Sequence, residues 1–169
     1  MFTIRHAVAS DIPLIRELCY QVWPQTYASI LTPAQIDYML AWMYSVESLQ
    51  QQLQQGIDYL LCYDDVKPVG FAALADHGAG DFKLEKIYVL PNQQGKGTGR
   101  YLLGQIIAQI TSKGATSLTL QVNKHNTAKS FYEKFGFEVI QEAVFDIGNG
   151  FVMDDYVMEL KLSRQNSLR

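Results

Sequence analysis

The sequence predicts a mixed α/β fold with a meander of strands at its centre. Three features of the pattern favour this class: apolar residues recur at helical spacing in the first third of the chain, short strand-like apolar runs follow, and helical and strand patterns alternate toward the end. Such an order favours a layered arrangement in which helices pack on a sheet. With 169 residues, 48% of them hydrophobic, the chain has enough apolar material for one packed domain.

A strand over residues 3–8 begins the predicted order, and three helices follow. Ser10 or Asp11 is predicted to cap the first helix, because short polar side chains accept the free N–H groups of a first turn. The apolar residues of this helix fall at helical spacing and are Leu14, Ile15, Leu18, Val22 and Trp23. A second helix begins after Thr32, and a third runs over residues 46–55.

Strand patterns dominate the remainder of the chain. They cover residues 59–63, 69–75, 82–90, 117–122, 137–147 and 151–162. Two more helices are interleaved with them, one over residues 98–113 and one that Asn126 caps and that runs to Phe135. Residues 1–162 are therefore predicted to form one domain, and residues 163–169 a polar tail.

Composition and charge narrow the class of protein. The net charge of -3 disfavours a nucleic-acid partner, because such domains usually carry a strong net positive charge. No apolar run reaches 18 residues, so no membrane span is predicted. Two cysteines, Cys19 and Cys62, are too few for a disulfide framework, and the first residues lack the apolar segment of a signal peptide. We expect a soluble cytoplasmic protein with reduced thiols.

Charge is unevenly distributed along the chain. From Lys86 to Lys129 every charged residue is basic, so this segment carries +6 and the remainder carries -9. Two interpretations remain open: solvated surface charges that are segregated by chance, or one face of the molecule suited to an anionic ligand.

Residues 94–99 form a glycine-rich loop, Gln-Gly-Lys-Gly-Thr-Gly, between a predicted strand and a predicted helix. Such a loop presents free backbone N–H groups at a helix N-terminus, where those donors and the helix dipole stabilise a phosphate group. It is not a Walker A loop, because Gly97 follows Lys96 where Ser or Thr is required. It is not a dinucleotide fingerprint, because Arg100 stands where the third glycine is needed. A purely structural turn at the start of a helix is the alternative.

The segments on either side of the loop make its interpretation specific. Residues 84–91 read LEKIYVLP just before it, and residues 120–137 read LQVNKHNTAKSFYEKFGF further along the chain. Together with the loop they resemble the GCN5-related N-acetyltransferases. The loop matches that superfamily's Arg/Gln-x-x-Gly-x-Gly/Ala signature, and the later segment is similar to its Asn…Ala…Phe-Tyr-x-Lys-x-Gly-Phe pattern. The resemblance extends over almost the whole chain.

The resemblance implies the fold of that superfamily, a mixed and mostly antiparallel central sheet flanked by helices. It also implies acetyl transfer from acetyl-CoA to a primary amine, without a metal ion. Residues 22–27, 145–148 and 157–160 further resemble the PaiA-type branch, which contains spermidine/spermine N-acetyltransferases, so the expected acceptor is a polyamine or another small amine. The alternatives are acetylation of a protein N-terminus or lysine, and a non-catalytic regulatory module that binds acetyl-CoA. A homodimer is left open.

The resemblance also assigns catalytic roles. Glu85 is expected to draw the proton from the amine, and to do so through water, because Val89 lies four residues along the strand, roughly 13 Å away. Alternatively, Glu85 is a surface carboxylate paired with Lys83 or Lys86. Tyr132 is expected to donate a hydrogen bond to the departing sulfur, or else to be an ordinary core tyrosine.

Contacts with acetyl-CoA are implied in the same way. Tyr88 and Val89 are expected to pair with the pantetheine arm, with the Val89 N–H facing the oxyanion, and Asn126 is expected to cap its helix and touch the cofactor. The pyrophosphate is expected on the loop residues Gln94, Gly95, Lys96, Gly97, Thr98, Gly99 and Arg100. Lys124 and Lys129 either serve the 3′-phosphate or are simply solvated.

Residues for the acceptor are less sharply indicated. Five aromatic residues lie in the early helices: Trp23, Tyr27, Tyr38, Trp42 and Tyr44. The resemblance implies that residues of this region line the acceptor cleft; alternatively, these five residues belong to the core. Three aspartates near the closing hairpin either meet a cationic amine or are solvated: Asp146, Asp154 and Asp155. The three histidines are scattered, without metal-ligand spacing: His6, His77 and His125.

Overall fold

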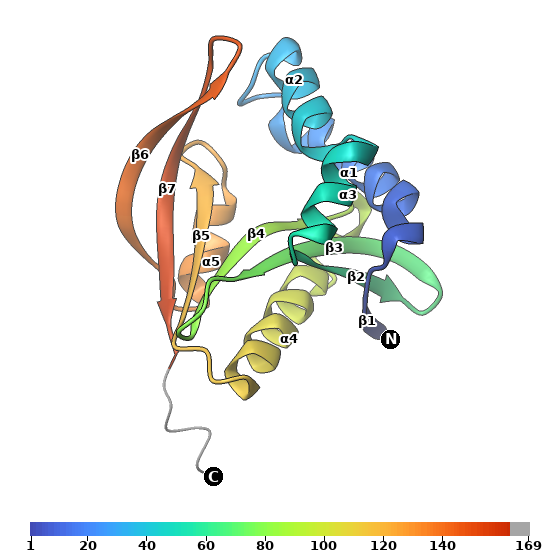
Figure 1. Cartoon of the computed structure of the whole chain (residues 1–169), viewed down its shortest axis with the longest axis vertical. Coiled ribbons are helices and arrows are strands. Elements are labelled where there is room, and N and C mark those ends of the chain that lie inside the picture. Colours follow the sequence, from blue (N-terminus) through green and yellow to red (C-terminus); the bar gives the residue numbers. More distant parts are fainter. Residues whose placement is uncertain (163–169) are drawn as a thin grey trace. The chain divides into compact units, whose positions relative to one another are not determined.

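The computed structural model describes residues 1–162 and contains, within them, seven strands and five α-helices (Figure 1). The strands are β1 (Phe2–His6), β2 (Asp58–Asp64), β3 (Lys67–Asp76), β4 (Asp81–Val89), β5 (Ser117–Asn123), β6 (Glu138–Gly148) and β7 (Phe151–Lys161). The helices are α1 (Ile12–Tyr27), α2 (Pro33–Tyr44), α3 (Val46–Gln54), α4 (Thr98–Ser112) and α5 (Ala128–Lys134). Two short 3-10 turns, η1 (Ala9–Asp11) and η2 (Pro91–Gln93), were not predicted. The predicted polar tail, residues 163–169, lies outside the described residues.

The strands follow the order β1-β2-β3-β4-β5-β7-β6. The pairs β1/β2, β2/β3, β5/β7 and β6/β7 are antiparallel, whereas β4 and β5 run parallel. The prediction of a mixed, mostly antiparallel sheet with helices is confirmed. No helix in residues 1–162 combines the length and the apolar character needed to cross a membrane.

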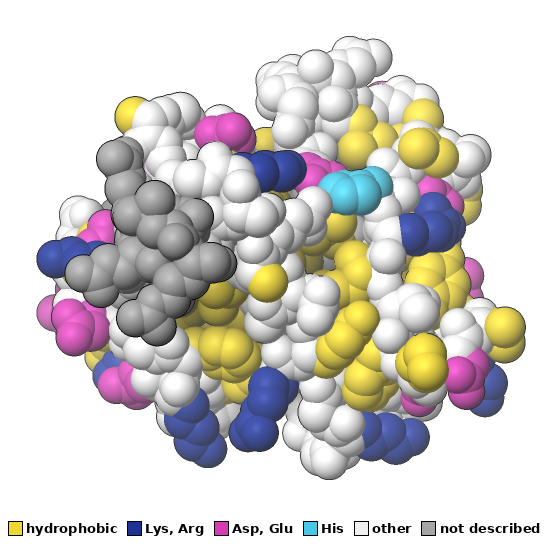
Figure 2. All heavy atoms as spheres, turned by 90° about the horizontal axis from the view of Figure 1, so that it is seen from below, with side chains coloured by type: hydrophobic (Ala, Val, Ile, Leu, Met, Phe, Trp, Pro, Cys, Tyr) yellow, Lys and Arg dark blue, Asp and Glu magenta, His cyan; other side chains and the backbone are white. Residues whose placement is uncertain are grey.

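The described chain comprises two compact units. The first contains Met1–Ala75 and Lys86–Ile106, and the second contains Asp76–Glu85 and the described residues from Ile107 onward. The chain passes between the units at the end of β3, within β4 and within α4, so each of these elements contributes residues to both. The basic segment is divided in the same way: Lys86, Lys96 and Arg100 belong to the first unit, and Lys113, Lys124 and Lys129 to the second. Both acidic and basic side chains are visible on the face drawn in Figure 2.

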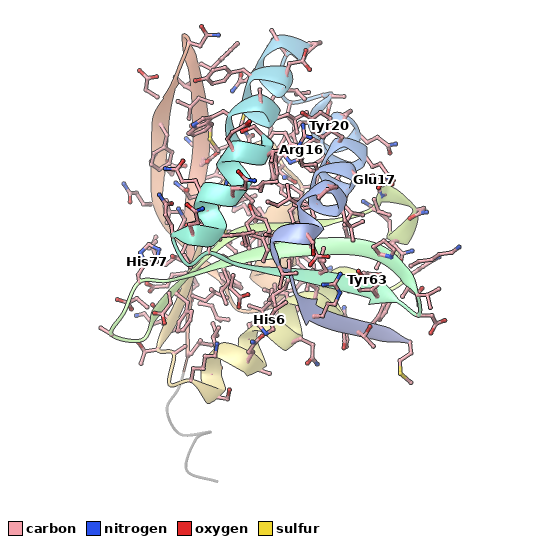
Figure 3. All side chains as sticks on the ribbon, turned by 45° about the vertical axis from the view of Figure 1, so that its right-hand side comes forward. His6, Arg16, Glu17, Tyr20, Tyr63 and His77 are labelled. Carbon is pink, nitrogen blue, oxygen red and sulfur yellow. The ribbon has the colours of Figure 1, made fainter. Side chains whose placement is uncertain are left out.

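The first unit is built on the antiparallel strands β1, β2 and β3. Figures 1 and 3 show α1, α2 and α3 on one face of these strands and the start of α4 on the other. Both faces are covered, since the consecutive β2 residues from Tyr59 to Cys62 are all fully buried although successive strand side chains point to opposite faces. Cys19 and Cys62 are buried free thiols, and burial raises their pKa to about 12 and about 11.

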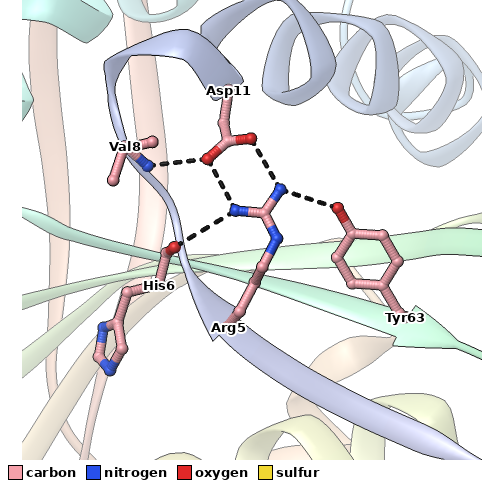
Figure 4. Close-up of polar contacts among 5 residues, drawn as sticks. All are labelled: Arg5, His6, Val8, Asp11 and Tyr63. Carbon is pink, nitrogen blue, oxygen red and sulfur yellow. Dashed lines mark hydrogen bonds and ion pairs between the residues drawn. The ribbon is translucent and has the colours of Figure 1, made fainter. Parts of the chain in front are cut away.

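Thr32 caps α2 as predicted, Ser45 caps α3 without having been predicted, and the prediction for α1 holds only for the position of the cap. Thr32 accepts the N–H of Gln35 at 3.1 Å, and Ser45 accepts the N–H of Ser48 at 3.1 Å. Ser10 lies in η1. Asp11 holds the N-cap position of α1, one of the two predicted, but its side chain does not cap the helix, because the carboxylate is directed elsewhere. It accepts hydrogen bonds from the Arg5 guanidinium at 2.7 and 2.8 Å and from the N–H of Val8 at 2.8 Å (Figure 4).

In the second unit, one face of the sheet is apolar and the other is polar. Along β5, Leu118, Leu120 and Val122 are buried, as their alternation predicts, and the residues between them are partly exposed. β7 pairs with β5 on one side and with β6 on the other. Because successive side chains point to opposite faces, the position of a polar residue along β5 or β7 decides on which face it lies.

Candidate functional site

The glycine loop lies in the first unit, between η2 and α4. Gly95 and Gly97 both have a φ of 80°, a conformation that side chains disfavour. A Cβ atom added at either position would meet no other heavy atom within 4 Å, so the loop is open on that side. The first turn of a helix leaves N–H groups without an intrahelical partner. A phosphate group could therefore approach the backbone of this loop closely.

Thr98 and Gln93 hold the loop from its buried side. The Thr98 hydroxyl donates to Gln93 Oε1 at 3.0 Å, and Thr98 is only 1% exposed. The N–H of Lys96 donates to the Gln93 carbonyl at 3.2 Å, and the N–H of Tyr101 donates to the Gly97 carbonyl at 2.9 Å. The Thr98 hydroxyl is thus engaged inside the protein and is not available to a ligand. Sequence reasoning missed Gln93, because a glutamine just before the loop carries no signal of a buried bond.

The loop also carries exposed positive charge. Lys96, Arg100 and the polar Gln94 are exposed. Within residues 1–162, neither Lys96 nor Arg100 forms an ion pair. Two unpaired cations beside an open helix N-terminus are suited to a phosphorylated ligand.

The end of β4 approaches β3 unusually closely. A Cβ atom on Gly70 would lie 2.7 Å from the Tyr88 carbonyl oxygen and 3.3 Å from the Val89 Cα. The N–H of Leu90 donates to the Val69 carbonyl at 2.8 Å. Gly70 is therefore needed for this approach, and a glycine inside a strand pattern was the signal that sequence reasoning left unused.

Of the five predicted acceptor aromatics, two form core, Tyr27 and Tyr38 are partly exposed, and one is exposed. Trp23 and Tyr44 are buried, and the Trp23 ring lies 4.5 Å from that of Tyr27 and 5.9 Å from that of Tyr88. The Tyr27 and Tyr88 hydroxyls are 3.0 Å apart, so the Tyr88 side chain packs into this cluster. By contrast, Trp42 is 49% exposed on α2.

Glu85 lies in the second unit and is partly exposed. Its Oε2 is 3.5 Å from the Lys83 Nζ, and its side chain is 30% exposed. The ion pair that the alternative interpretation predicted with Lys83 is therefore present. Lys86 is engaged elsewhere: its Nζ donates to Gln52 Oε1 at 2.8 Å and to the Tyr59 hydroxyl at 2.7 Å.

Tyr132 and Asn126 also lie in the second unit. Tyr132 is 8% exposed, and its ring packs 5.4 Å from Phe131 and 5.8 Å from Phe137. Asn126 is not the N-cap of α5, because Thr127 holds that position. Asn126 Oδ1 nevertheless accepts a hydrogen bond from the N–H of Ala128 at 2.9 Å. Its side chain therefore satisfies one N–H group of the first turn of α5 from the position just before the N-cap.

The three aspartates near the closing hairpin differ in environment. Asp146 accepts the N–H of Gly148 at 2.8 Å within the turn, and Asp154 lies 3.1 Å from the Lys124 Nζ. Asp155 is 1% exposed, and neither of its carboxylate oxygens has a hydrogen-bond partner among the described residues. Burial raises the pKa of Asp155 to about 6; Asp154 adds to this effect and Lys83 opposes it.

The candidate residues are thus divided between the two units. Those in the first unit are Tyr88, Val89, Gln94, Gly95, Lys96, Gly97, Thr98, Gly99 and Arg100, and those in the second are Glu85, Asn126 and Tyr132. Lys124 is held by Asp154, and Lys129 lies 4.8 Å from the centre of the Tyr156 ring, so both lysines have protein partners. Within residues 1–162, no three His, Cys, Asp or Glu side chains are placed to hold a metal ion.

Comparisons with known proteins agree with the resemblance to N-acetyltransferases. A family model described as an acetyltransferase (GNAT) domain matches residues 28–160. The [Ribosomal protein bS18]-alanine N-acetyltransferase of Haemophilus influenzae is 39% identical over 72 residues, which span 43% of this chain and about half (49%) of that protein. The spermidine N(1)-acetyltransferase of Thermoplasma acidophilum is 28% identical over 157 residues, which span 89% of this chain and 94% of that protein.

A solved structure shares the fold over almost the full length. The crystal structure of the PaiA N-acetyltransferase from Thermoplasma acidophilum in complex with coenzyme A aligns with a TM-score of 0.80 and 27% identity. The alignment covers 96% of this chain and 99% of that one. The open glycine loop with its exposed Lys96 and Arg100 fits a ligand that carries a pyrophosphate, as coenzyme A does.

Proposed function

Because this chain belongs to the GNAT family of acetyltransferases, we propose that it transfers the acetyl group of acetyl-CoA to a primary amine, and that the acceptor is a polyamine or another small amine. The observation that carries the proposal is the open loop at Gly95 and Gly97, which leads directly into α4. The similarity to a spermidine N(1)-acetyltransferase over 89% of the chain supports the choice of acceptor. Two buried free thiols are typical of a reducing compartment, so we assign the reaction to the cytoplasm.

The first unit binds the cofactor in this proposal. The backbone N–H groups of Gly95, Gly97, Gly99 and Arg100 donate to the pyrophosphate, Thr98 holds the loop from its buried side, and Lys96 and Arg100 add positive charge. Tyr88 contributes backbone rather than side chain, since its hydroxyl lies 3.0 Å from that of Tyr27. Bound acetyl-CoA supplies the acetyl group as a reactive thioester.

The residues of the chain divide the proton transfers. An amine that is protonated near neutral pH must lose a proton before it can attack, and Glu85 accepts this proton through water. Its 30% exposure leaves the carboxylate accessible to water. The Val89 N–H donates to the oxyanion that forms at the thioester carbon. The Tyr132 hydroxyl donates to the departing sulfur, and Asn126 contacts the cofactor beside α5.

A second acceptor class has its own support. The alanine N-acetyltransferase from Haemophilus influenzae is 39% identical over 72 residues, a higher identity than that of the spermidine enzyme over a shorter stretch. The α-amino group of a protein N-terminus is therefore the second candidate acceptor. Both candidates use the same chemistry on a primary amine and differ only in what surrounds it.

A turnover assay with a panel of acceptors tests the proposal. The panel contains spermidine, 1,4-diaminobutane, a peptide with an N-terminal alanine and a peptide with an internal lysine. Release of free CoA thiol measures the rate, and mass spectrometry identifies the acetylated product. We expect the polyamines to be acetylated with the highest kcat/KM. A preference for the alanine peptide would select the second candidate. Binding of acetyl-CoA without any acetylated product would instead indicate a non-catalytic module.

A further inference from the structure

One face of the second unit's sheet carries a line of polar side chains that ends at a buried carboxylate. The Lys83 Nζ lies 3.1 Å from Gln121 Oε1 and 3.5 Å from Glu85 Oε2, so these three side chains share a face. Asn123 follows Gln121 by two residues on β5 and therefore faces the same way. Asp155 is the partner of Asn123 across the β5/β7 ladder, and directly paired residues share a face.

Among the described residues, Asp155 has neither a hydrogen-bond partner nor an ion-pair partner, and Lys83 offsets its charge only in part. It is 1% exposed, and both carboxylate oxygens lack a hydrogen-bond partner among the described residues. Its sequence neighbour Asp154 points to the opposite face and is paired with Lys124. The charged groups that the register places on the Asp155 face are Asp81, Lys83, Glu85, Glu138, Glu159 and Lys161. Of the two cations, Lys161 lies six residues along β7, roughly 20 Å away, and Lys83 is already engaged by Glu85 and Gln121.

A buried carboxylate without a partner is costly, and buried polar atoms almost always have one. Burial raises the pKa of Asp155 only to about 6, so at neutral pH most molecules carry the negative charge there. A cation that supplies hydrogen-bond donors would both balance this charge and satisfy the two oxygens. Within residues 1–162, no set of three possible metal ligands surrounds the position. A protonated primary amine, with three N–H donors, matches the two carboxylate oxygens.

We propose that Asp155 binds a protonated amino group of the acceptor other than the one that is acetylated. This inference rests on the proposed function. β5 separates β4 from β7, and Asp155 pairs with Asn123, two residues beyond the position level with Glu85, so Glu85 and Asp155 are about 12 Å apart along the sheet. Side chains stand roughly perpendicular to a sheet, so one amine does not contact both carboxylates. An acceptor that uses both residues carries at least two amino groups joined by a short chain.

Three acceptors with the same four-carbon chain test this assignment: 1,4-diaminobutane, 4-amino-1-butanol and butylamine. Only the first carries a second positive charge. We expect the wild-type protein to prefer the diamine over butylamine by tenfold or more in kcat/KM. Asp155→Asn keeps the shape of the side chain and removes its charge, so it should raise KM for the diamine about tenfold and change kcat/KM for butylamine less than twofold.

Glu142→Gln is the matched control. It removes one negative charge from the neighbouring strand, beside Ala143, which is the β6 partner of Asp155. Glu142 lies on the opposite face, paired in register with Tyr156, so this variant should behave as the wild type does. An equal loss for all three amines in Asp155→Asn, or the same loss of diamine preference in Glu142→Gln, would overturn the proposal.

A binding measurement separates this inference from the proposed function. Calorimetric titration of the CoA-bound protein with 1,4-diaminobutane and with butylamine needs no turnover. If no amine is acetylated but the wild-type protein binds the diamine tenfold more tightly than butylamine, the proposed function fails and the role of Asp155 in binding stands. If the wild-type protein binds the two amines equally, the role of Asp155 is refuted even when acetylation occurs. This comparison uses no variant, so it holds even where Asp155→Asn does not fold.

Discussion

Gly70 on β3 lies against the backbone of Tyr88 on β4, so closely that a Cβ atom on Gly70 would be 2.7 Å from the Tyr88 carbonyl oxygen. The contact is with backbone, which cannot rotate away as a side chain can. It fixes the position of the β4 end from which Tyr88 and Val89 are proposed to contact the pantetheine arm. The absence of a side chain at Gly70 is thus a condition for that part of the proposed cofactor site.

Gly70→Ala should push the end of β4 away from β3. We expect a loss of about 1–3 kcal/mol in the free energy of unfolding, the usual cost of overpacking, together with weaker binding of acetyl-CoA. Urea denaturation and calorimetric titration measure the two effects. Gly104→Ala is the control, because a Cβ atom at Gly104 in α4 meets nothing within 4 Å and alanine favours a helix. Unchanged stability and affinity in Gly70→Ala would contradict this account.

Gly97→Asp should abolish binding of acetyl-CoA. It places a side chain and a negative charge where the backbone donors are proposed to face a pyrophosphate. In the wild-type protein, acetyl-CoA at about 100 times its dissociation constant should stabilise the fold by roughly 2.7 kcal/mol, and ATP or NAD should not. Melting curves with each ligand measure this.

Gly56→Asp is the control for backbone strain in that experiment. Gly56 has a φ of 92° and open space around it, so the substitution introduces a comparable strain at the end of α3, away from the glycine loop. Its stabilisation by acetyl-CoA should match that of the wild type. If Gly97→Asp folds and binds acetyl-CoA with wild-type affinity, the loop is only a structural turn.

Glu85→Gln should lower kcat/KM by about 10²–10⁴-fold, the usual contribution of general base catalysis. Part of the loss should be recovered at high pH, where more of the amine is already neutral. Lys83→Gln removes the 3.5 Å ion pair but keeps the carboxylate, so it should cost much less. The measurement is a pH–rate profile for each protein. If kcat/KM falls by less than about threefold and the acidic limb of the pH–rate profile does not move, Glu85 is a surface carboxylate and not the base.

Tyr132→Phe should lower kcat with little change in affinity for acetyl-CoA, because the lost hydrogen bond acts mainly as the thiolate leaves. The ring packing against Phe131 and Phe137 is kept in this variant, so the fold should be nearly as stable as that of the wild type. Loss of a hydroxyl bond costs about 1 kcal/mol, which a melting curve detects. An unchanged kcat would assign Tyr132 to the core alone.

Asp155 should make stability depend on pH in a defined direction. Its pKa is raised from 3.8 to about 6 in the folded protein, so the folded state holds this proton more tightly than the unfolded state does. Stability from this group is therefore present below about pH 4 and is lost as the pH rises through 6. A shift of two pKa units corresponds to on the order of 3 kcal/mol.

The comparison of wild-type protein with Asp155→Asn isolates that effect. Between pH 4 and pH 7 the wild type should lose on the order of 3 kcal/mol relative to the variant. Asp11 acts in the opposite sense, since its hydrogen bonds to Arg5 lower its pKa to about 2, but this contribution is common to both proteins and cancels. Urea denaturation at four pH values between 4 and 7 provides the data. A difference independent of pH would show that Asp155 does not titrate in this range.

The sequence by itself determined the elements and the loop. Each depends on neighbours within a few positions: the alternation of Leu118, Leu120 and Val122 predicted β5, and glycines before an apolar helical pattern predicted the turn into α4. Thr32 was identified as a cap for the same reason, since its partner Gln35 is three residues away. The role of the Asp11 side chain was not predicted, because its partner Arg5 lies on β1 and its guanidinium binds the carboxylate, which therefore does not cap α1.

Only the tertiary structure decided which polar residues face one another and which are buried. Asp154 and Asp155 are adjacent and chemically identical in the sequence, yet one pairs with Lys124 and the other is buried and has no hydrogen-bond partner among residues 1–162. That difference follows from the register of β7 against β5, which pairs Asp155 with Asn123, a residue 32 positions earlier in the chain. Likewise, nothing near Gly70 in the sequence indicates that Tyr88 lies against it. Strand pairing brings such residues together over long separations, and a one-residue shift in register would exchange the two faces.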